Sequence, residues 1–184
     1  MNVNQQDKSV REEISFRVIG IIRSEHTDET HTPIQPVFAK GAPGKAIIDP
    51  LFEDGLQDLE GFSHIFLYYY FHQAPPPQLR VKPYLDNVRR GVFATRSPRR
   101  PNPLGMSLVR LVRRERSVLF LEDVDILDGT PLLDIKPFIP RFDALANATG
   151  GWSTAVDERT AQIEGRRGYG ESDPADGNRH GERG

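Results

Sequence analysis

The sequence predicts a mainly β protein, folded as an all-β barrel or sandwich. Several short runs are rich in β-branched and aromatic residues, which is typical of strands. Turn residues are frequent between these runs, and the chain of 184 residues contains 16 Gly and 15 Pro. Few stretches have apolar residues at helical spacing. The length suits one domain with a substantial core and polar ends.

The first elements are separated by a long loop. Residues 15–24 (SFRVIGIIRS) predict a strand, because the run is short, β-branched and followed by polar residues. Residues 25–44 contain too many Thr, Pro and Gly for regular structure, and long loops inside compact domains are often functional. Residues 45–50 predict a second strand. Residues 52–62 carry two leucines at helical spacing, which indicates one or two helical turns.

The run HIFLYYYFH (64–72) is the strongest strand signal in the chain. Strand alternation places Ile65, Leu67, Tyr69 and Phe71 on one face, and His64, Phe66, Tyr68, Tyr70 and His72 on the other. The two histidines are eight residues apart, about 26 Å in an extended strand, so they cannot bind one metal ion.

Four further runs complete the β pattern: 91–97, 106–115, 117–127 and 131–140. The second and third of these runs predict a hairpin that turns near residues 115–117.

Three regions are expected along the chain. Residues 1–13 are polar and aperiodic, which predicts a disordered lead-in. Residues 14–143 form the domain. Residues 144–184 form a polar, Gly- and charge-rich tail, which we expect to be largely disordered.

Composition excludes several classes of site. The chain has no Cys, so disulfides, a thiolate nucleophile and zinc sites with sulfur ligands are excluded. The five histidines lack the spacing of a metal site, and the common nucleotide-binding and hydrolase motifs are absent, so no metal is expected. No apolar run is long enough to span a membrane, and no signal peptide is evident. We therefore expect a cytoplasmic protein.

Charge is distributed unevenly. Residues 80–116, termed the basic block, have a net charge of +9, although the whole chain carries −2. Its eleven cations are Arg80, Lys82, Arg89, Arg90, Arg96, Arg99, Arg100, Arg110, Arg113, Arg114 and Arg116. The excess of Arg favours contact with a polyanion, because the planar guanidinium suits phosphates and bases. A solvated surface paired with acidic side chains is the alternative.

Two segments carry the densest arrangement of binding groups. ATRSPRRPNPLGMS (94–107) interleaves prolines with arginines, so it forms a stiff loop that loses little entropy on binding a polar ligand. In DILDGTPLLDIKPFIP (125–140), the DGTP sequence predicts a turn in which Gly129 adopts a positive φ.

These segments resemble the TsaA-like family, whose characterised members are the TrmO tRNA methyltransferases. GVFATRSPRRPNPLGMS (91–107) and DGTPLLDIKP (128–137) are similar to its two hallmark segments. The matching order continues at Gly20–Ser24, Pro33–Gln35, LEGFSH (59–64) and FHQ (71–73), so the resemblance covers about residues 15–143.

The resemblance implies a single compact β-barrel that binds S-adenosylmethionine and forms a homodimer. The implied reaction methylates N6 of N6-threonylcarbamoyladenosine at position 37 of tRNA. Cofactor contacts carry over to Pro33, Ile34, Gln35, His72, Gln73, Arg96, Leu104, Asp128, Gly129, Thr130, Pro131 and Asp134. Residues expected to bind RNA are Arg89, Arg90, Arg99, Arg100, Asn102, Arg113 and Arg114.

The roles of individual residues follow less directly from the sequence than the family resemblance does. Arg96 is the candidate partner of the methionine carboxylate, or of tRNA instead. Asp134 and His72 are the candidate proton acceptors, because N6 loses a proton during transfer. The alternatives are an ion pair between Asp134 and Lys136, and a structural role for His72.

Two other functions are compatible with the sequence. A non-enzymatic RNA-binding barrel would use the same basic block and the aromatic residues 68–71. A methyltransferase with the same pocket could act on a different acceptor. Phe138 stands where the family usually has Tyr, which loses a hydroxyl. Bacterial members commonly carry an additional C-terminal domain, whereas this chain is expected to end in a flexible tail, which favours a dimer with a composite tRNA surface.

Overall fold

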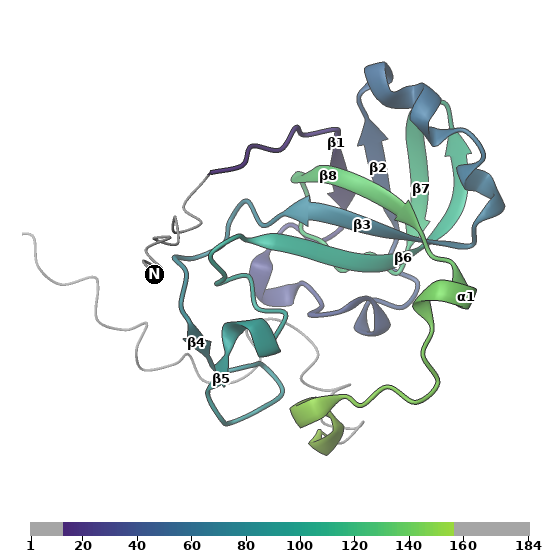
Figure 1. Cartoon of the computed structure of the whole chain (residues 1–184). Coiled ribbons are helices and arrows are strands. Elements are labelled where there is room, and N and C mark those ends of the chain that lie inside the picture. Colours follow the sequence, from purple (N-terminus) through teal and green to yellow (C-terminus); the bar gives the residue numbers. More distant parts are fainter. Residues whose placement is uncertain (1–12, 157–184) are drawn as a thin grey trace, which may run out of the picture.

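The computed structural model describes residues 13–156, which form a closed six-stranded barrel (Figure 1). All neighbouring strands are antiparallel. In order around the barrel the strands are β1 (Gly20–Ser24), β2 (Gly44–Ile48), β7 (Val118–Glu122), β6 (Leu104–Glu115), β3 (His64–Tyr70) and β8 (Thr130–Pro137). This confirms the predicted fold class. Of the two predicted architectures, the structure is a barrel and not a sandwich.

Each strand contributes fully buried side chains to one core. β3 buries Ile65, Leu67 and Tyr69, which confirms the predicted inner face of this strand. The other strands contribute Ile22, Ala46, Leu119, Val109 and Leu132, each fully buried. Removal of this apolar surface from water is the main stabilising term of the fold.

The predicted hairpin is confirmed. β6 pairs with β7 up to Glu115 and Val118, and Arg116 at the turn adopts a left-handed φ of 53°. β6 is the longest strand of the barrel, and the turn lies against β2, because the Ser117 carbonyl accepts a hydrogen bond from the Ile48 amide at 2.9 Å.

The predicted strand over 91–97 is wrong. Only β5 (Arg90–Gly91) is extended, and it pairs with β4 (Arg80–Val81) outside the barrel. The chain then makes a 3-10 turn over Val92–Ala94, because the Thr95 amide and hydroxyl both donate to the Val92 carbonyl. Such local hydrogen bonds compete with strand pairing.

The predicted strand over 117–127 ends early, at Glu122. Asp123 adopts a left-handed φ of 63°, and the next residues form a buried loop. The Val124 amide donates to the Ala42 carbonyl at 3.2 Å, and the Ser24 hydroxyl donates to the Ile126 carbonyl at 2.6 Å. This loop therefore packs against the long connection between β1 and β2.

Helical segments are short. Residues 52–62 contain 3-10 turns where one or two helical turns were predicted. The 3-10 turns are η1 (Glu29–His31), η2 (Pro36–Phe38), η3 (Pro50–Leu56), η4 (Leu59–Gly61), η5 (Val92–Ala94) and η6 (Gly151–Ala155), and the α-helix is α1 (Pro140–Asp143). No helix in the described part of the chain has the length and apolar character of a membrane span.

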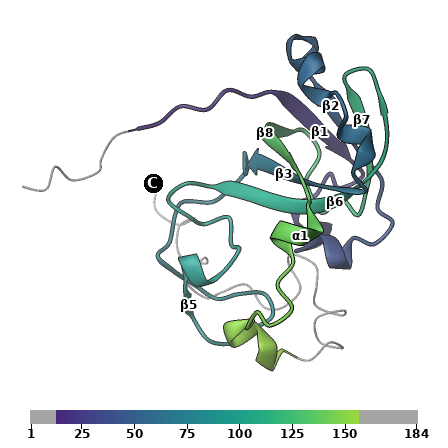
Figure 2. The same ribbon diagram turned by 45° about the vertical axis from the view of Figure 1, so that its right-hand side comes forward.

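The chain continues in a defined path beyond residue 143, where the domain was expected to end. Its last described segment, η6, lies beside the excursion that carries β4 and β5 (Figure 2). The predicted lead-in and the tail beyond residue 156 lie outside the described residues, apart from residue 13.

A glycine on β6 is required by the ring of Tyr69. Gly105 pairs with Tyr69 across the β3–β6 ladder, and a Cβ atom on Gly105 would overlap that ring. Gly105→Ala should therefore lower the free energy of unfolding by about 1–3 kcal/mol, as over-packing does. Urea unfolding measures this, and Gly91→Ala is the control, because a Cβ there meets no atom within 4 Å. Equal midpoints for the two variants would contradict the packing argument.

Candidate cofactor and RNA site

The barrel closes between β1 and β8 through the predicted DGTP turn. Gly129 has a φ of 76°, as predicted, and its amide donates to the Ile22 carbonyl at 2.9 Å. The Asp128 carboxylate accepts hydrogen bonds from the Ser24 amide at 3.1 Å and from the Arg23 guanidinium at 3.2 Å. These contacts fix the start of β8 against β1.

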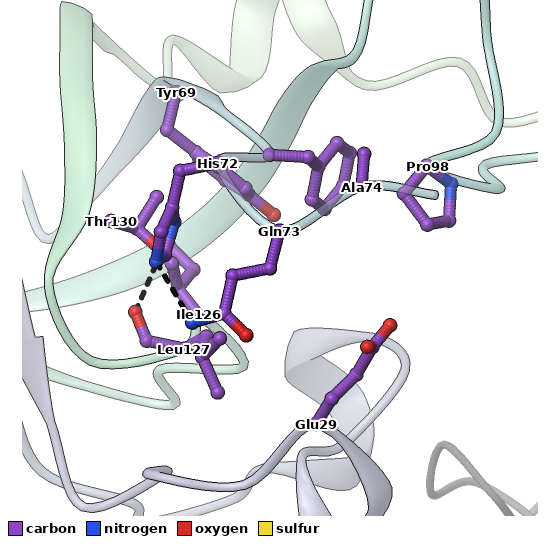
Figure 3. Close-up of a pocket in the computed structure, with 10 residues that line it drawn as sticks. Glu29, Tyr69, His72, Gln73, Ala74, Pro98, Ile126, Leu127 and Thr130 are labelled. Atoms are coloured by element: carbon purple, nitrogen blue, oxygen red, sulfur yellow. Dashed lines mark hydrogen bonds between the residues drawn. The ribbon is translucent and has the colours of Figure 1, made fainter. Parts of the chain in front are cut away.

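A cavity opens where β3 ends, beside this turn (Figure 3). We term it the first cavity. Its empty space, including its open side, is about 340 Å³. It is lined by Glu29, Tyr69, Phe71, His72, Gln73, Ala74, Pro98, Ile126, Leu127 and Thr130. The walls are largely apolar, with four polar side chains at defined places.

A chain of hydrogen bonds holds His72 in this cavity. The Gln73 amide nitrogen lies 3.3 Å from His72 Nε2, and His72 Nδ1 lies 3.4 Å from the Thr130 hydroxyl. The Thr130 hydroxyl donates to the Leu127 carbonyl at 2.7 Å. In the tautomer with its hydrogen on Nδ1, the imidazole donates to the Thr130 hydroxyl and accepts from the Gln73 amide through Nε2. Nε2 then carries the lone pair.

The floor of the cavity is rigid. The Tyr69 and Ser107 hydroxyls are hydrogen-bonded at 3.0 Å in the core, and Phe71 packs edge-on against Tyr69 with ring centroids 5.2 Å apart. Buried, bonded hydroxyls of this kind fix side-chain positions. The aromatic wall is therefore preorganised for a ligand.

Glu29 reaches the cavity from the opposite side (Figure 3). It is the first residue of η1, whose N-cap is Asp28. The Asp28 carboxylate accepts from the Thr30 amide at 2.8 Å and from its hydroxyl at 2.6 Å, and contacts the His31 ring at 2.7 Å. The Thr30 hydroxyl bond is the largest cause that lowers the pKa of Asp28 to about 2.

A second, wider cavity lies on the other side of the proline-rich loop (residues 95–103). Ser97 lines the second cavity and its neighbour Pro98 lines the first. The second cavity is lined by Ile34, Gln35, Lys82, Pro83, Tyr84, Leu85, Phe93, Ala94, Thr95, Arg96, Ser97, Gly150, Trp152 and Ser153. The Arg96 guanidinium donates to the Gln35 side-chain carbonyl, which joins the two long loops there.

The predicted cofactor contacts divide between these cavities. His72, Gln73 and Thr130 line the first, whereas Ile34, Gln35 and Arg96 line the second. Pro33 is buried just before this group, and Leu104 begins β6. Asp128, Gly129 and Pro131 form the turn that carries Thr130 into the first cavity.

Asp134 is not among the residues that line either cavity. It lies on β8 opposite Tyr68, and its carboxylate pairs with Lys136 at 2.7 Å. The ion pair raises the pKa of Lys136. Phe138, farther along the chain, packs edge-on against Phe66 with ring centroids 5.8 Å apart. The structure thus favours the ion-pair alternative for Asp134 and leaves His72 as the candidate proton acceptor that lines a cavity.

The predicted RNA-binding residues fall into two separated groups. Arg89, Arg90, Arg99, Arg100 and Asn102 lie in the β4–β5 excursion and the proline-rich loop. Arg113 and Arg114 lie about 30 Å farther along β6, at the hairpin end.

Several cations of the basic block have acidic or carbonyl partners. Arg90 pairs with Asp86 at 2.8 Å, Arg114 with Glu60 at 3.0 Å, and Arg113 with Glu115. Arg100 donates to carbonyls of its own loop. Several cations of the basic block therefore stabilise the local structure through these ion pairs and hydrogen bonds.

Sequence reasoning missed several residues that line the cavities. Glu29 lies in the long connection between β1 and β2, Ile126 and Leu127 lie in the loop after β7, and Trp152 lies in the predicted tail. The sequence pattern that could have indicated Ile126 and Leu127 is the mainly apolar run of residues 124–127, which was predicted to be part of a strand. Within the described residues, no group of acidic and histidine side chains could hold a metal ion.

Comparison with known proteins identifies the fold. Residues 21–144 match the family described as the tRNA-methyltransferase O N-terminal domain. The chain belongs to that family. The matched segment contains the barrel strands β2 to β8 and nearly all of β1, together with the lining of the first cavity.

Two relatives and one solved structure give the extent of the likeness. A probable S-adenosyl-L-methionine-binding protein of Pyrococcus abyssi is 52% identical over 139 residues, which are 76% of each chain. The tRNA (adenine(37)-N6)-methyltransferase of Escherichia coli is 39% identical over 151 residues, covering 77% of this chain and 64% of that enzyme. The crystal structure of TrmO from Pseudomonas aeruginosa superposes with a TM-score of 0.65 at 40% identity, covering 77% of this chain and 63% of that one.

The coverage is not symmetrical. This chain spans slightly less than two thirds of the Escherichia coli and Pseudomonas aeruginosa proteins, and the matched family segment ends at residue 144. Trp152 and η6 lie beyond that matched family segment.

The capping of η1 predicts an acidic titration. The pKa of Asp28 should be about 2 by NMR, and Thr30→Ala should raise it toward its ordinary value, because the largest stabilising hydrogen bond is lost. The folded pKa lies below the unfolded one, so the carboxylate stabilises η1 above about pH 4, and this contribution is lost as the pH falls toward 2. Thr27→Ala is the control and should leave the titration unchanged. An Asp28 pKa near 4 in the unsubstituted protein would refute the capping account.

Proposed function

We propose that this chain transfers a methyl group from S-adenosylmethionine to N6 of N6-threonylcarbamoyladenosine at position 37 of tRNA. Family membership carries the general activity, a tRNA methyltransferase that uses S-adenosylmethionine. The observation that supports a cofactor site here is the hydrogen-bonded His72–Thr130 pair at the mouth of an apolar cavity. The proposal goes beyond family membership in naming the threonylcarbamoyl group on the acceptor adenosine.

The first cavity fits the chemistry of the cofactor. Its aromatic and aliphatic wall suits the flat adenine, and the Gln73 amide can read a polar edge of that ring. Glu29 places a carboxylate where a cationic sulfonium or ammonium group would be stabilised. S-adenosylmethionine supplies the electrophilic methyl group when bound.

Arg96 completes the proposed cofactor site from the second cavity. Its guanidinium already donates to the Gln35 side-chain carbonyl, so the side chain points toward the loop that precedes η2. A guanidinium can bind a carboxylate through two parallel hydrogen bonds, which fits the methionine end of the cofactor. Gln35 then serves to hold Arg96 in place.

The reaction requires positioning and a proton acceptor. Attack on a methyl sulfonium is an in-line displacement, so alignment of the acceptor nitrogen contributes most of the acceleration. N6 is a poor nucleophile, because it is conjugated with a carbonyl, and it must lose its proton. We assign this role to His72 Nε2 rather than to Asp134, because Nε2 lies at the first cavity and its lone pair is released when the Gln73 amide turns to the cofactor, whereas Asp134 pairs with Lys136.

The tRNA would lie across the proline-rich loop. Arg99, Arg100 and Asn102 stand there beside both cavities, and phosphate contacts would make binding fall steeply with salt. The target base must leave the anticodon stack to reach the site. A tRNA substrate is consistent with a cytoplasmic location.

A homodimer is part of the proposal. Tyr70 and Leu104 are paired neighbours on the outer face of β3 and β6, and Met106 follows on the same face. They are 44%, 42% and 40% exposed. An exposed apolar patch of this kind suits a symmetric contact with a second copy.

The experiment measures transfer of labelled methyl groups to total tRNA. Label should enter normal tRNA, but not tRNA from a strain unable to make threonylcarbamoyladenosine. Arg96→Ala should reduce kcat/KM by about tenfold or more, because a charge-assisted hydrogen bond is lost. Arg17→Ala is the control, since Arg17 is exposed outside the domain core. Sedimentation of the same sample should give twice the chain mass of 20.8 kDa.

Other outcomes identify the alternatives. Equal labelling of both tRNA pools would show that the methyl acceptor is a different nucleotide. Cofactor binding without any transfer to tRNA would indicate a different class of acceptor. RNA binding without cofactor binding would indicate that the protein is a non-enzymatic RNA-binding barrel.

A further inference from the structure

The segment beyond the family domain builds one wall of the second cavity. The Trp152 indole nitrogen donates to the Ala94 carbonyl at 2.7 Å, which ties η6 to the turn before the proline-rich loop. The Arg90 guanidinium carbon lies 5.9 Å from the centre of the indole ring, within the range of a cation–π contact. Both ribbon views place this segment beside the β4–β5 excursion (Figures 1 and 2).

The lining of this cavity combines aromatic rings with cations. Tyr84 and Phe93 are 42% and 75% exposed, so their rings remain accessible next to Trp152. Lys82 and Arg96 supply positive charge, and none of the described residues that line the cavity is acidic. The empty space, including its open side, is about 1230 Å³, considerably larger than that of the first cavity.

We propose that the second cavity binds an unpaired nucleotide of the tRNA, with its base stacked on Trp152 and its phosphate near Lys82. Exposed aromatic rings beside cations are the arrangement by which proteins hold single-stranded nucleic acid. An uncharged apolar ligand would make no ion pair with Lys82 and Arg96. An acidic peptide would pair with these cations but would not stack on the three aromatic rings. This inference rests on the proposed function, because tRNA is the polyanion that it assumes.

The position of the cavity gives the bound nucleotide a role. Ser97 and Pro98 are consecutive residues that line the second and first cavities. A nucleotide held in the second cavity would thus lie next to the proposed cofactor site, which Arg96 completes from that cavity. Stacking there would hold the anticodon loop open while the target base enters the first cavity.

The cofactor is the competing occupant, because Ile34, Gln35 and Arg96 line this cavity. Trp152 is the only tryptophan of the chain, so intrinsic fluorescence separates the two ligands. A synthetic anticodon stem–loop should change the tryptophan emission saturably without cofactor. S-adenosylmethionine alone should leave the emission unchanged, and so should a fully paired RNA duplex. An emission change with S-adenosylmethionine but not with the stem–loop, or with neither ligand, would overturn the inference.

Variants test the stacking itself. Trp152→Ala should weaken stem–loop binding by about fivefold or more, measured by anisotropy of labelled RNA. It should raise KM for tRNA without changing kcat or the affinity for S-adenosylmethionine. Trp152→Phe should largely restore binding, because a ring is retained. Phe142→Ala is the control, since this ring is 70% exposed on α1 and is not part of the cavity lining.

The two proposals fail differently. Unchanged RNA binding in Trp152→Ala, with normal circular dichroism, would overturn this inference and leave the methyltransferase proposal intact. Loss of RNA binding in a protein that transfers no methyl group would support the nucleotide site and reject the proposed reaction.

Discussion

Pairing of β1 with β8 closes the barrel, and the site depends on this closure. The left-handed Gly129 and the Asp128 carboxylate hold the start of β8 against β1. Thr130 is thereby buried at the end of β3, where its hydroxyl meets His72. Without this register, the imidazole would have no fixed orientation in the first cavity. Closure also removes free sheet edges, so the functional loops extend from a rigid frame.

Two long loops convert this frame into a binding surface. The connection between β1 and β2 passes from Glu29 at the first cavity to Gln35 at the second. The proline-rich loop runs between the same cavities, and Arg96 joins the two loops through Gln35. The loops therefore have little freedom to lose on binding. This arrangement places a proposed cofactor site and a proposed nucleotide site next to each other along one stiff loop.

Local periodicity predicted a mainly β fold, the inner face of β3 and the β6–β7 hairpin, and the family resemblance implied the barrel. It also predicted the positive φ of Gly129, which the DGTP turn requires. It failed at residues 91–97, where Thr95 bonds locally to Val92 and replaces a strand. It did not predict Glu29 or Trp152, because their positions depend on contacts between segments far apart in the chain. The family resemblance named twelve cofactor residues, but only the tertiary structure shows that six of them line two cavities, three in each.

The central claim is that barrel closure orients His72 for cofactor binding through Thr130. Calorimetric titration of S-adenosylmethionine into Thr130→Val tests it directly, because valine keeps the shape but removes the hydroxyl bonded to His72. The account predicts about tenfold weaker binding, with Thr27→Val, at an exposed position, unchanged. Unaltered affinity in a folded Thr130→Val protein would show that the His72–Thr130 contact does not build the cofactor site.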